Sequence, residues 1–184
     1  MVVSVTIQHL FKYPLEFVAN THFQKYPSKG EKFVVRVDTV EHRRDVVHGI
    51  NYWRRIAVCA NVIPGILRTI NVLNEQNFLL EEEAWLDFRK PEFRLQSCNI
   101  TWSKYAHIWE ESTFKPSQDN PKWTVLEQHG VVEVKAFGPF GRVLEMFAQR
   151  FLQSGVKRGL RIMEELLQER ASKAYITQDN PSVS

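Results

Sequence analysis

The chain is dominated by short segments in which apolar and polar residues alternate, or in which apolar residues run together between turn-forming residues. Both patterns are typical of β-strands, because successive side chains of a strand point to opposite faces of a sheet. Seven segments show them: 1–11, 33–40, 50–58, 78–88, 93–102, 107–114 and 123–137. A turn at residues 45–49 joins the second and third segments, and Pro, Gly, Asn, Asp or Ser residues separate the later ones. The pattern predicts a mostly antiparallel sheet.

Two segments have instead the three- to four-residue apolar spacing of a helix. The first begins near Pro14, a residue tolerated in a first helical turn, and ends at Tyr26, which precedes Pro27. The second has an apolar stripe from Val143 to Leu167 and, at about 1.5 Å per residue, is long enough to cross a whole sheet. This order of elements predicts an α+β fold with the helices on one face of the sheet. A curved sheet closed by a long helix encloses a volume.

One apolar segment fits neither period. The stretch CANVIPGILRTINVL, residues 59–73, carries a single charge, Arg68, and is interrupted by Pro64 and Gly65. One interpretation is a movable cover over the enclosed volume, hinged at the proline and glycine. The other is a loop helix packed permanently into the core, which is what apolar stripes usually form. The pattern leaves both open.

Composition narrows the class of protein. Of the 184 residues, 43% are hydrophobic and 24% charged, which is typical of one globular domain. The net charge is only +3 and the basic residues are spread along the chain, so extensive nucleic-acid binding is not expected. The longest uncharged run, residues 56–67, is shorter than the roughly 18 residues that a membrane-spanning helix needs. The first eleven residues resemble neither a secretory signal nor a transit peptide.

Catalytic and metal-binding motifs are absent from the sequence. There is no nucleophile elbow, no phosphate-binding loop and no zinc-binding helix, and the two cysteines and six histidines lack ligand spacing. The stretch 138–141 is interpreted as a turn, and His22 as a hydrogen-bonded core residue. The acidic runs 81–83 and 110–111 alternate across a strand, so they are interpreted as a solvated face. Neither an enzyme nor a bound cofactor or metal is expected.

Basic residues fall on several predicted elements. Lys25 closes the first helix, Arg54 and Arg55 precede the apolar segment, and Lys157, Arg158 and Arg161 lie on the long helix. A surface position is the simpler interpretation of each. If one or two of them point inward, a phosphate would offset the cost of burying their charge. An apolar cavity with a cationic floor would suit a phospholipid.

Several of these segments resemble the PRELI domain family, which includes the slowmo and Ups proteins. The resemblance runs from about Val3 to about Glu169 and depends on the order and spacing of short motifs. These are the opening strand with Phe11, Lys25-Tyr26-Pro27, Arg55-Ile56 before a proline-containing loop, Asn99-Ile100-Thr101, Trp123-Thr124, and Phe151 with Val156-Lys157-Arg158. The resemblance implies a fold similar to START and phosphatidylinositol-transfer domains, with a seven-stranded curved antiparallel sheet, a short N-terminal helix, a lid loop and a long C-terminal helix around a lipid cavity.

The resemblance also implies a function and its residues. The family carries phospholipids, notably phosphatidic acid or phosphatidylserine, across the mitochondrial intermembrane space, usually with a small helical-hairpin protein that bears paired cysteine motifs. By position, Lys25, Arg55 and Lys157 are implied to bind the headgroup. The implied lid loop contains Val62, Ile63, Pro64, Ile66, Leu67 and Ile70, and it would contact membranes.

The expected organisation is one lipid-transfer domain, residues 1–171, followed by a disordered polar tail, residues 172–184. The expected function is an intracellular phospholipid carrier that binds one lipid in a closed cavity, is not an enzyme and binds no nucleic acid. The alternative is a protein-interaction adaptor of the same compartment that transports nothing and fills its interior with its own side chains.

Overall fold

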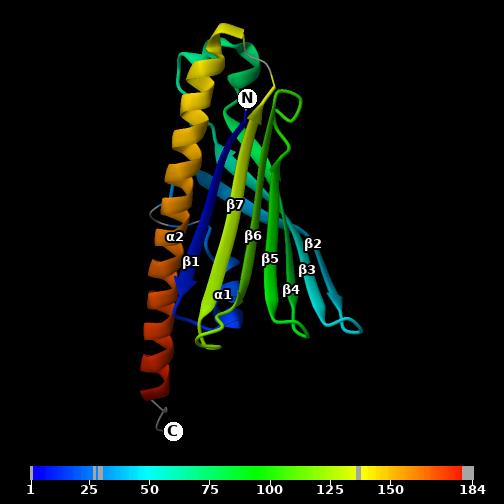
Figure 1. Cartoon of the computed structure of the whole chain (residues 1–184), viewed down its shortest axis with the longest axis vertical. Helices are drawn as coiled ribbons and strands as arrows, with labels where there is room; N and C mark the ends of the chain where they lie inside the picture. Colours follow the sequence, from blue (N-terminus) through cyan, green and yellow to red (C-terminus); the bar gives the residue numbers. More distant parts are fainter. Residues whose placement is uncertain (1, 27, 29–30, 136–137, 180–184) are drawn as a thin grey trace.

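The computed structural model describes residues 2–26, 28, 31–135 and 138–179, with side chains as far as Ala174. It contains β1 (Val2–Phe11), α1 (Leu15–His22), β2 (Val34–Asp45), β3 (Ile50–Ala60), the 3-10 turns η1 (Leu67–Thr69) and η2 (Asn71–Leu73), β4 (Asn77–Asp87), β5 (Glu92–Asn99), β6 (Ala106–Pro116), β7 (Thr124–Val134), the 3-10 turn η3 (Gly138–Phe140) and α2 (Gly141–Asp179). The seven strands form one antiparallel sheet in the order β1-β7-β6-β5-β4-β3-β2 (Figure 1).

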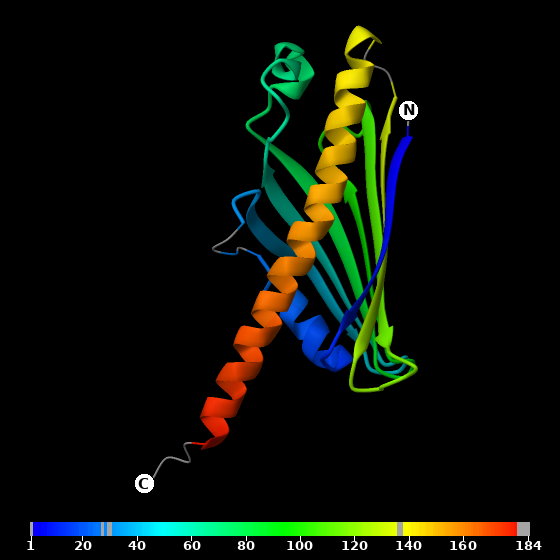
Figure 2. The same cartoon turned by 60° about the vertical axis from the view of Figure 1, so that its left-hand side comes forward.

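Both α-helices lie on the same side of this curved sheet. Helix α2 crosses its concave face as a long diagonal strut, and α1 sits beneath the strands near one end (Figure 2). Helix α2 packs mainly against β1, β7 and α1. The apolar segment and the first turns of α2 lie together at the opposite end (Figures 1 and 2). The α+β class, the seven-stranded antiparallel sheet and the long closing helix are thus confirmed.

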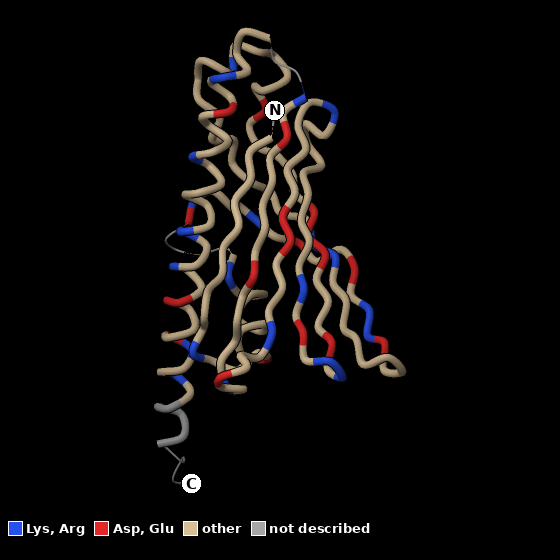
Figure 3. The backbone as a smooth tube through the Cα atoms, in the orientation of Figure 1, with Lys and Arg blue, Asp and Glu red and all other residues tan. Residues whose placement is uncertain are grey.

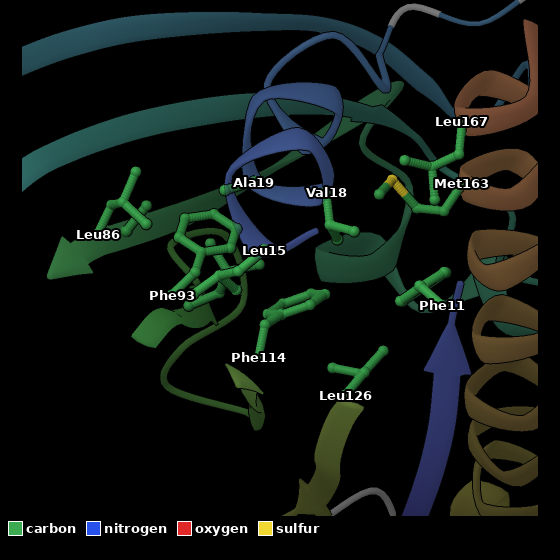
Figure 4. Close-up of a cluster of buried hydrophobic side chains, with 12 residues drawn as sticks. Phe11, Leu15, Val18, Ala19, Leu86, Phe93, Phe114, Leu126, Met163 and Leu167 are labelled. Carbon is green, nitrogen blue, oxygen red and sulfur yellow. The ribbon is translucent and has the colours of Figure 1, made fainter. Parts of the chain in front are cut away.

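A first hydrophobic cluster closes the end of the molecule that carries α1. Phe11 and Phe93 are fully buried there, and α1 contributes Leu15 and Val18 (Figure 4). The remaining buried members are Ala19, Ala84, Leu86, Leu95, Phe114, Leu126, Met163 and Leu167. Met163 and Leu167 lie on the predicted apolar stripe of α2, so this stripe forms the closing side of the cluster.

A second cluster closes the other end. The apolar segment contributes Ile63, Leu67 and Leu73, which pack against Leu144, Ala148 and Leu152 of α2 and against Val132 and Val134 of β7. A smaller group, Val34, Cys59 and Phe78, adjoins it. The two clusters therefore close the two ends of the space between the sheet and α2. The middle of that space is lined by both apolar and charged side chains.

Several elements differ from their predicted extents: α1 ends at His22 rather than Tyr26, β5 ends at Asn99 rather than residue 102, and the largest differences are in β2 and α2. Strand β2 runs to Asp45 rather than residue 40, because bulges between Val34 and Arg36 and between Thr39 and Glu41 break its alternation. Helix α2 continues to Asp179, so residues 172–179, expected in a disordered tail, are helical. The apolar stripe ends at Leu167, but the Glu, Gln, Arg, Ala and Lys residues that follow have high helix propensity. The last residues of the expected tail, 180–184, lie outside the described residues. Within the described part of the chain, no helix has the length and apolar character needed to cross a membrane.

Candidate functional site

The middle of the molecule contains a cavity of about 230 Å³ between the concave face of the sheet, the end of α1 and the centre of α2. Its walls combine apolar side chains with six charged ones: Lys25, Glu31, Arg55, Glu82, Glu110 and Arg158. A second, almost wholly apolar cavity of about 60 Å³ lies beneath the apolar segment. Ile108 and Phe151 line both cavities, so the second is an apolar extension of the first toward the end that the segment covers.

The polar part of the wall is one row of side chains that crosses four adjacent strands. Arg55 of β3 pairs with Glu82 of β4, Glu82 with Ser97 of β5, and Ser97 with Glu110 of β6. Neighbours in such a row have Cβ atoms about 4.5–5.5 Å apart. All four residues line the cavity, and acidic residues gather across the middle of the strands in Figure 3. We call Arg55, Glu82, Ser97 and Glu110 the polar row.

The next residues along each strand on the same face are mainly apolar. Ala57 and Leu80 lie on one side of the polar row, and Ala84 and Leu95 lie on the other. The concave face is therefore amphipathic, with one charged band between two apolar regions. Such a surface suits a ligand that has a polar group and long apolar chains.

Arg55 is held by ionic and aromatic contacts. Its Nε donates to Glu82 Oε1 at 2.9 Å, its Nη2 donates to the same oxygen, and its guanidinium carbon lies 5.0 Å from the ring centroid of Phe23. The His22 Nε2 atom lies 2.9 Å from Arg55 Nη2. The same Nε2 lies 3.2 Å from Glu82 Oε2, so the ring contacts both members of the ion pair, and burial lowers the pKa of His22. Arg55 thus points inward, as its predicted role requires, but Glu82 already balances its charge.

Glu82 is ionised despite its position. Burial by itself would raise the pKa of this carboxyl, but His22 and Arg55 together hold the pKa at about 2. Arg55 supplies the permanent positive charge, and the His22 ring contacts the same carboxylate. Arg55 and Glu82 form a largely buried ion pair within the cavity wall.

Lys25 follows α1 and reaches into the cavity toward α2. Its Nζ lies 5.1 Å from the ring centroid of Tyr26 and 3.1 Å from the position that a Cβ at Gly159 would occupy. A side chain at Gly159 would therefore push the ammonium aside. Burial lowers the pKa of Lys25, and Glu110 and Glu82 oppose this only partly. Among the described residues, no carboxylate forms a salt bridge with Lys25, so its charge is the one that a ligand anion would best balance.

The long helix presents Arg158, and not Lys157, to the cavity. Lys157 is exposed and does not line the cavity, whereas Arg158 does and forms an ion pair with the buried Glu31. Consecutive helix residues point about 100° apart, so a shift of one position decides which of them faces inward. The structure brings Lys25 and Arg55 together at one cavity and leaves Lys157 outside it.

The structure corrects the interpretation of the acidic runs as a solvated face. Glu82 and Glu110 line the cavity, while Glu111 borders a groove on the outer face of the sheet. The alternation contains this signal: Phe78, Ala84 and Leu86 of β4 are buried at even positions, and Glu82 shares their face. In β6 the buried residues Ser112 and Phe114 likewise share a face with Glu110.

Glu110 is the least compensated of the inward acids. Burial raises its pKa, and the opposing influences of Lys25 and Gln128 are smaller. None of the salt bridges among the described residues involves Glu110. Once the pairs Arg55–Glu82 and Glu31–Arg158 are set aside, the cavity retains one cation, Lys25, and one carboxyl, Glu110.

The predicted lid loop is an ordered cover built from two 3-10 turns. Of its expected members, Ile63 and Leu67 are buried, Pro64 and Ile70 are half-buried, and Val62 and Ile66 are exposed. Ile63 and Val62 line the smaller cavity. We call residues 62–73 the lid segment. Its inner side completes the second hydrophobic cluster, and its outer side leaves branched apolar side chains in solvent.

Three polar side chains fasten the lid segment. Asn61 Nδ2 donates to the carbonyl oxygens of Leu73 at 2.9 Å and Glu75 at 2.6 Å, and Asn61 Oδ1 accepts from the Ile63 amide at 2.9 Å. Arg68 Nε donates to Ile63 O at 2.9 Å, and Trp102 Nε1 donates to Val72 O at 2.7 Å. The single charge of the segment therefore holds its backbone. These bonds close the loop at its base, so Asn61 controls how readily it opens.

Replacing Asn61 with alanine is expected to loosen the lid segment. The change leaves the buried Ile63 amide and two carbonyls without their partner, which costs about 1–3 kcal/mol. Amide hydrogen exchange of residues 62–73, measured by mass spectrometry, should accelerate about 5- to 100-fold. Thr69→Ala is the matched control, because the Thr69 hydroxyl donates to Ile66 O on the exposed side of the same loop. Equal exchange in wild type and Asn61→Ala would show that Asn61 does not fasten the segment.

The fold and cavity together define a known structural class, in which a curved antiparallel sheet wraps around a long C-terminal helix. A crystal structure of TTHA0849 from Thermus thermophilus matches with a TM-score of 0.57 at 15% identity, covering 91% of this chain and 99% of the other. The Zhui aromatase/cyclase from Streptomyces sp. R1128 matches with a TM-score of 0.55 at 12% identity, covering 94% and 95%. These likenesses show the START- and cyclase-like fold.

The family is shown by sequence. The profile of the PRELI-like family matches residues 16–173. A UPS-like protein of Schizosaccharomyces pombe is 31% identical over 129 residues, covering 70% of this chain and 68% of the relative. The slowmo homolog of Dictyostelium discoideum is 25% identical over 162 residues, covering 88% and 70%. The chain belongs to the PRELI-like family, which is generally associated with lipid binding and transfer.

Proposed function

We propose that this protein is a non-enzymatic carrier that moves one phospholipid, phosphatidic acid or phosphatidylserine, between mitochondrial membranes. The observation that carries the proposal is the amphipathic cavity, in which the ammonium of Lys25 forms no salt bridge with any described carboxylate. A phosphate on Lys25 would balance the cost of burying that charge. Transfer makes and breaks no covalent bond, so no nucleophile or metal is required.

The two cavities suggest how the lipid lies. Its phosphate would sit at the polar row and Lys25, and its chains would extend past Ile108 and Phe151 toward the lid segment. Ligand pockets typically measure about 300–1,000 Å³, and the larger cavity here is about 230 Å³. Two full acyl chains would therefore require the lid segment to move outward. Each buried methylene contributes about 0.8 kcal/mol, which nearly offsets what the chain loses on leaving the bilayer.

The lid segment would also be the part that meets the membrane. Val62 and Ile66 are 44% and 63% exposed at the end where the lid segment lies beside the start of α2 (Figure 2). Side chains of this kind can enter the interfacial region of a bilayer while the loop opens. Family membership supports two further parts of the proposal: a location in the intermembrane space, and a small helical-hairpin partner with paired cysteine motifs.

A transfer assay tests the proposal. The purified chain, alone and with the helical-hairpin partner, is mixed with donor liposomes that contain labelled phosphatidic acid or phosphatidylserine and with unlabelled acceptors. We expect transfer above the rate without protein, and native mass spectrometry should show one phospholipid per chain. A chain that neither transfers nor retains any phospholipid, with or without the partner, would favour the adaptor. Release of a cleaved lipid product would contradict the assignment as a non-enzyme.

A further inference from the structure

The charges of the cavity are balanced, with three basic residues (Lys25, Arg55, Arg158) and three acidic ones (Glu31, Glu82, Glu110) in its wall. Four of these six residues form two ion pairs, Arg55 with Glu82 and Arg158 with Glu31. Lys25 and Glu110 remain, and both face the same cavity without a salt bridge to each other or to another described residue. A ligand that fits this site must satisfy a cation and a carboxyl at once.

We propose that Glu110 is a specificity-determining residue that accepts the ammonium of an aminophospholipid headgroup while Lys25 binds the phosphate of the same lipid. This proposal deepens the proposed carrier function and depends on it. The chemical class that it selects is a phosphodiester with a primary amine, such as phosphatidylethanolamine or phosphatidylserine. Phosphatidic acid lacks the amine and is expected to be the poorer ligand.

The position of Glu110 supports this assignment. It lies at the β6 end of the polar row, with Ser97 between it and Glu82. Strands lie about 4.8 Å apart, so Glu110 is separated from the Arg55–Glu82 pair by roughly 10 Å and does not share in that pairing. An ammonium between Ser97 and Glu110 would have a hydroxyl and a carboxylate as hydrogen-bond acceptors.

The electrostatic surroundings of Glu110 also support a role in binding an ammonium. A carboxylate without a cation is costly to bury, and the pKa of Glu110 is raised for that reason. An incoming ammonium would stabilise the ionised form, as a charge-assisted hydrogen bond does elsewhere. A phosphate monoester without an amine would bring negative charge toward this same carboxyl, with Lys25 alone to balance it. Repulsion of this kind separates related ligands as effectively as attraction does.

A simpler role for Glu110 is to act as a distant counter-ion of Lys25. In that case, removing its charge would change the transfer of all lipids by the same factor. A role in specificity predicts instead that the ratio between lipids changes. The selectivity ratio, and not the absolute rate, therefore distinguishes the two roles.

The experiment uses the full chain with labelled phosphatidylethanolamine, phosphatidylserine or phosphatidic acid, each diluted in the same phosphatidylcholine liposomes. We expect wild type to transfer at least one aminophospholipid faster than phosphatidic acid. Glu110→Gln should lower the ratio of aminophospholipid to phosphatidic acid transfer about tenfold or more, which is the size expected for loss of one charge-assisted hydrogen bond. Glu111→Gln, the neighbour on the outer face of the same strand, should leave the ratio unchanged.

Glu110→Asp provides a second variant that keeps the charge on a shorter side chain, and it should retain part of the selectivity. A preference of wild type for phosphatidic acid, or an unchanged ratio in Glu110→Gln, would overturn the role of Glu110 while leaving the carrier function standing. If no lipid is transferred or retained by wild type, the carrier function and this inference fail together. Faster transfer of phosphatidylserine than of phosphatidylethanolamine would support the proposal and add a subsite for the serine carboxylate.

Discussion

Lys25→Met is expected to raise the melting temperature of the protein and to lower phospholipid transfer about 10- to 100-fold. The ammonium lies in the cavity without a salt bridge to any described carboxylate, and its pKa is lowered mainly by burial. A lowered pKa means that the folded protein disfavours the charged form. Since lysine is charged in the unfolded chain near pH 7, this residue reduces stability there, and the penalty shrinks as the pH rises toward the pKa of the unfolded chain. Methionine has similar length and no charge.

The loss of transfer has a separate cause. A charge-assisted hydrogen bond to phosphate is worth about 1.5–3 kcal/mol, which corresponds to the expected decrease. Binding sites commonly hold residues that stabilise a ligand at the expense of the fold. Thermal unfolding by circular dichroism and the liposome assay measure the two effects on the same samples.

Lys122→Met is the control for removal of an exposed lysine, and it should change neither quantity. Lys157→Met tests the third residue that was predicted to bind the headgroup. Because Lys157 is exposed and outside the cavity wall, this substitution should lower transfer less than Lys25→Met does. Transfer by Lys25→Met at the wild-type rate would contradict the proposed role of Lys25 in binding the phosphate.

Arg55→Leu is expected to reduce the free energy of unfolding by about 3 kcal/mol, because it leaves the Glu82 carboxylate without its guanidinium, with the His22 ring as its remaining contact. The Arg55 side chain is 8% exposed and that of Glu82 is 22% exposed. Arg55→Glu would be worse, since it places two carboxylates at adjacent positions of the polar row. Loss of transfer in either single variant would therefore not by itself assign a headgroup role to Arg55.

The double variant Arg55→Leu/Glu82→Leu resolves this difficulty. Replacing both members of a buried ion pair with apolar residues is often neutral or stabilising, so most of the lost stability should return. Urea unfolding measures it, and the liposome assay then tests the guanidinium in a folded protein. Arg54→Leu is the matched control on the neighbouring position, because its partners Glu41 and Glu81 are 34% and 29% exposed and such pairs contribute about 0–1 kcal/mol. Equal destabilisation by Arg54→Leu and Arg55→Leu would contradict the buried pair.

Features that depend on residues close together in the chain were predicted more accurately than features that depend on long-range contacts. The strands and α2 were predicted because their periods of two and of three to four residues are set by residues close together in the chain. Strand β2 was predicted too short, since its two bulges shift the alternation halfway along. The end of α2 was missed because burial stops at Leu167 while helix propensity continues.

The candidate site was predicted in part. Lys25 and Arg55 were chosen by resemblance, and both line the cavity. Lys157 was chosen in place of Arg158, because a motif locates a basic residue on a helix without fixing its direction to within one position. Glu82 and Glu110 were assigned to solvent, although the apolar residues two positions away in their own strands lie on the buried face. Charged residues are usually exposed, and this general preference was given more weight than the alternation of buried residues in β4 and β6, which places both glutamates on the inner face.

The sequence by itself determined the order of the elements, the alternation of faces along the strands that have no bulge, and the apolar segment between β3 and β4. These properties depend on periodicity, which a single segment contains. Only the tertiary structure decided which charges balance one another: Arg55 and Glu82 are 27 positions apart and Glu31 and Arg158 are further still, yet each pair meets in the cavity wall. Pairing across strands and helices follows from the register of the sheet and the crossing of α2, and these long-range contacts leave Lys25 and Glu110 without salt bridges in the described structure.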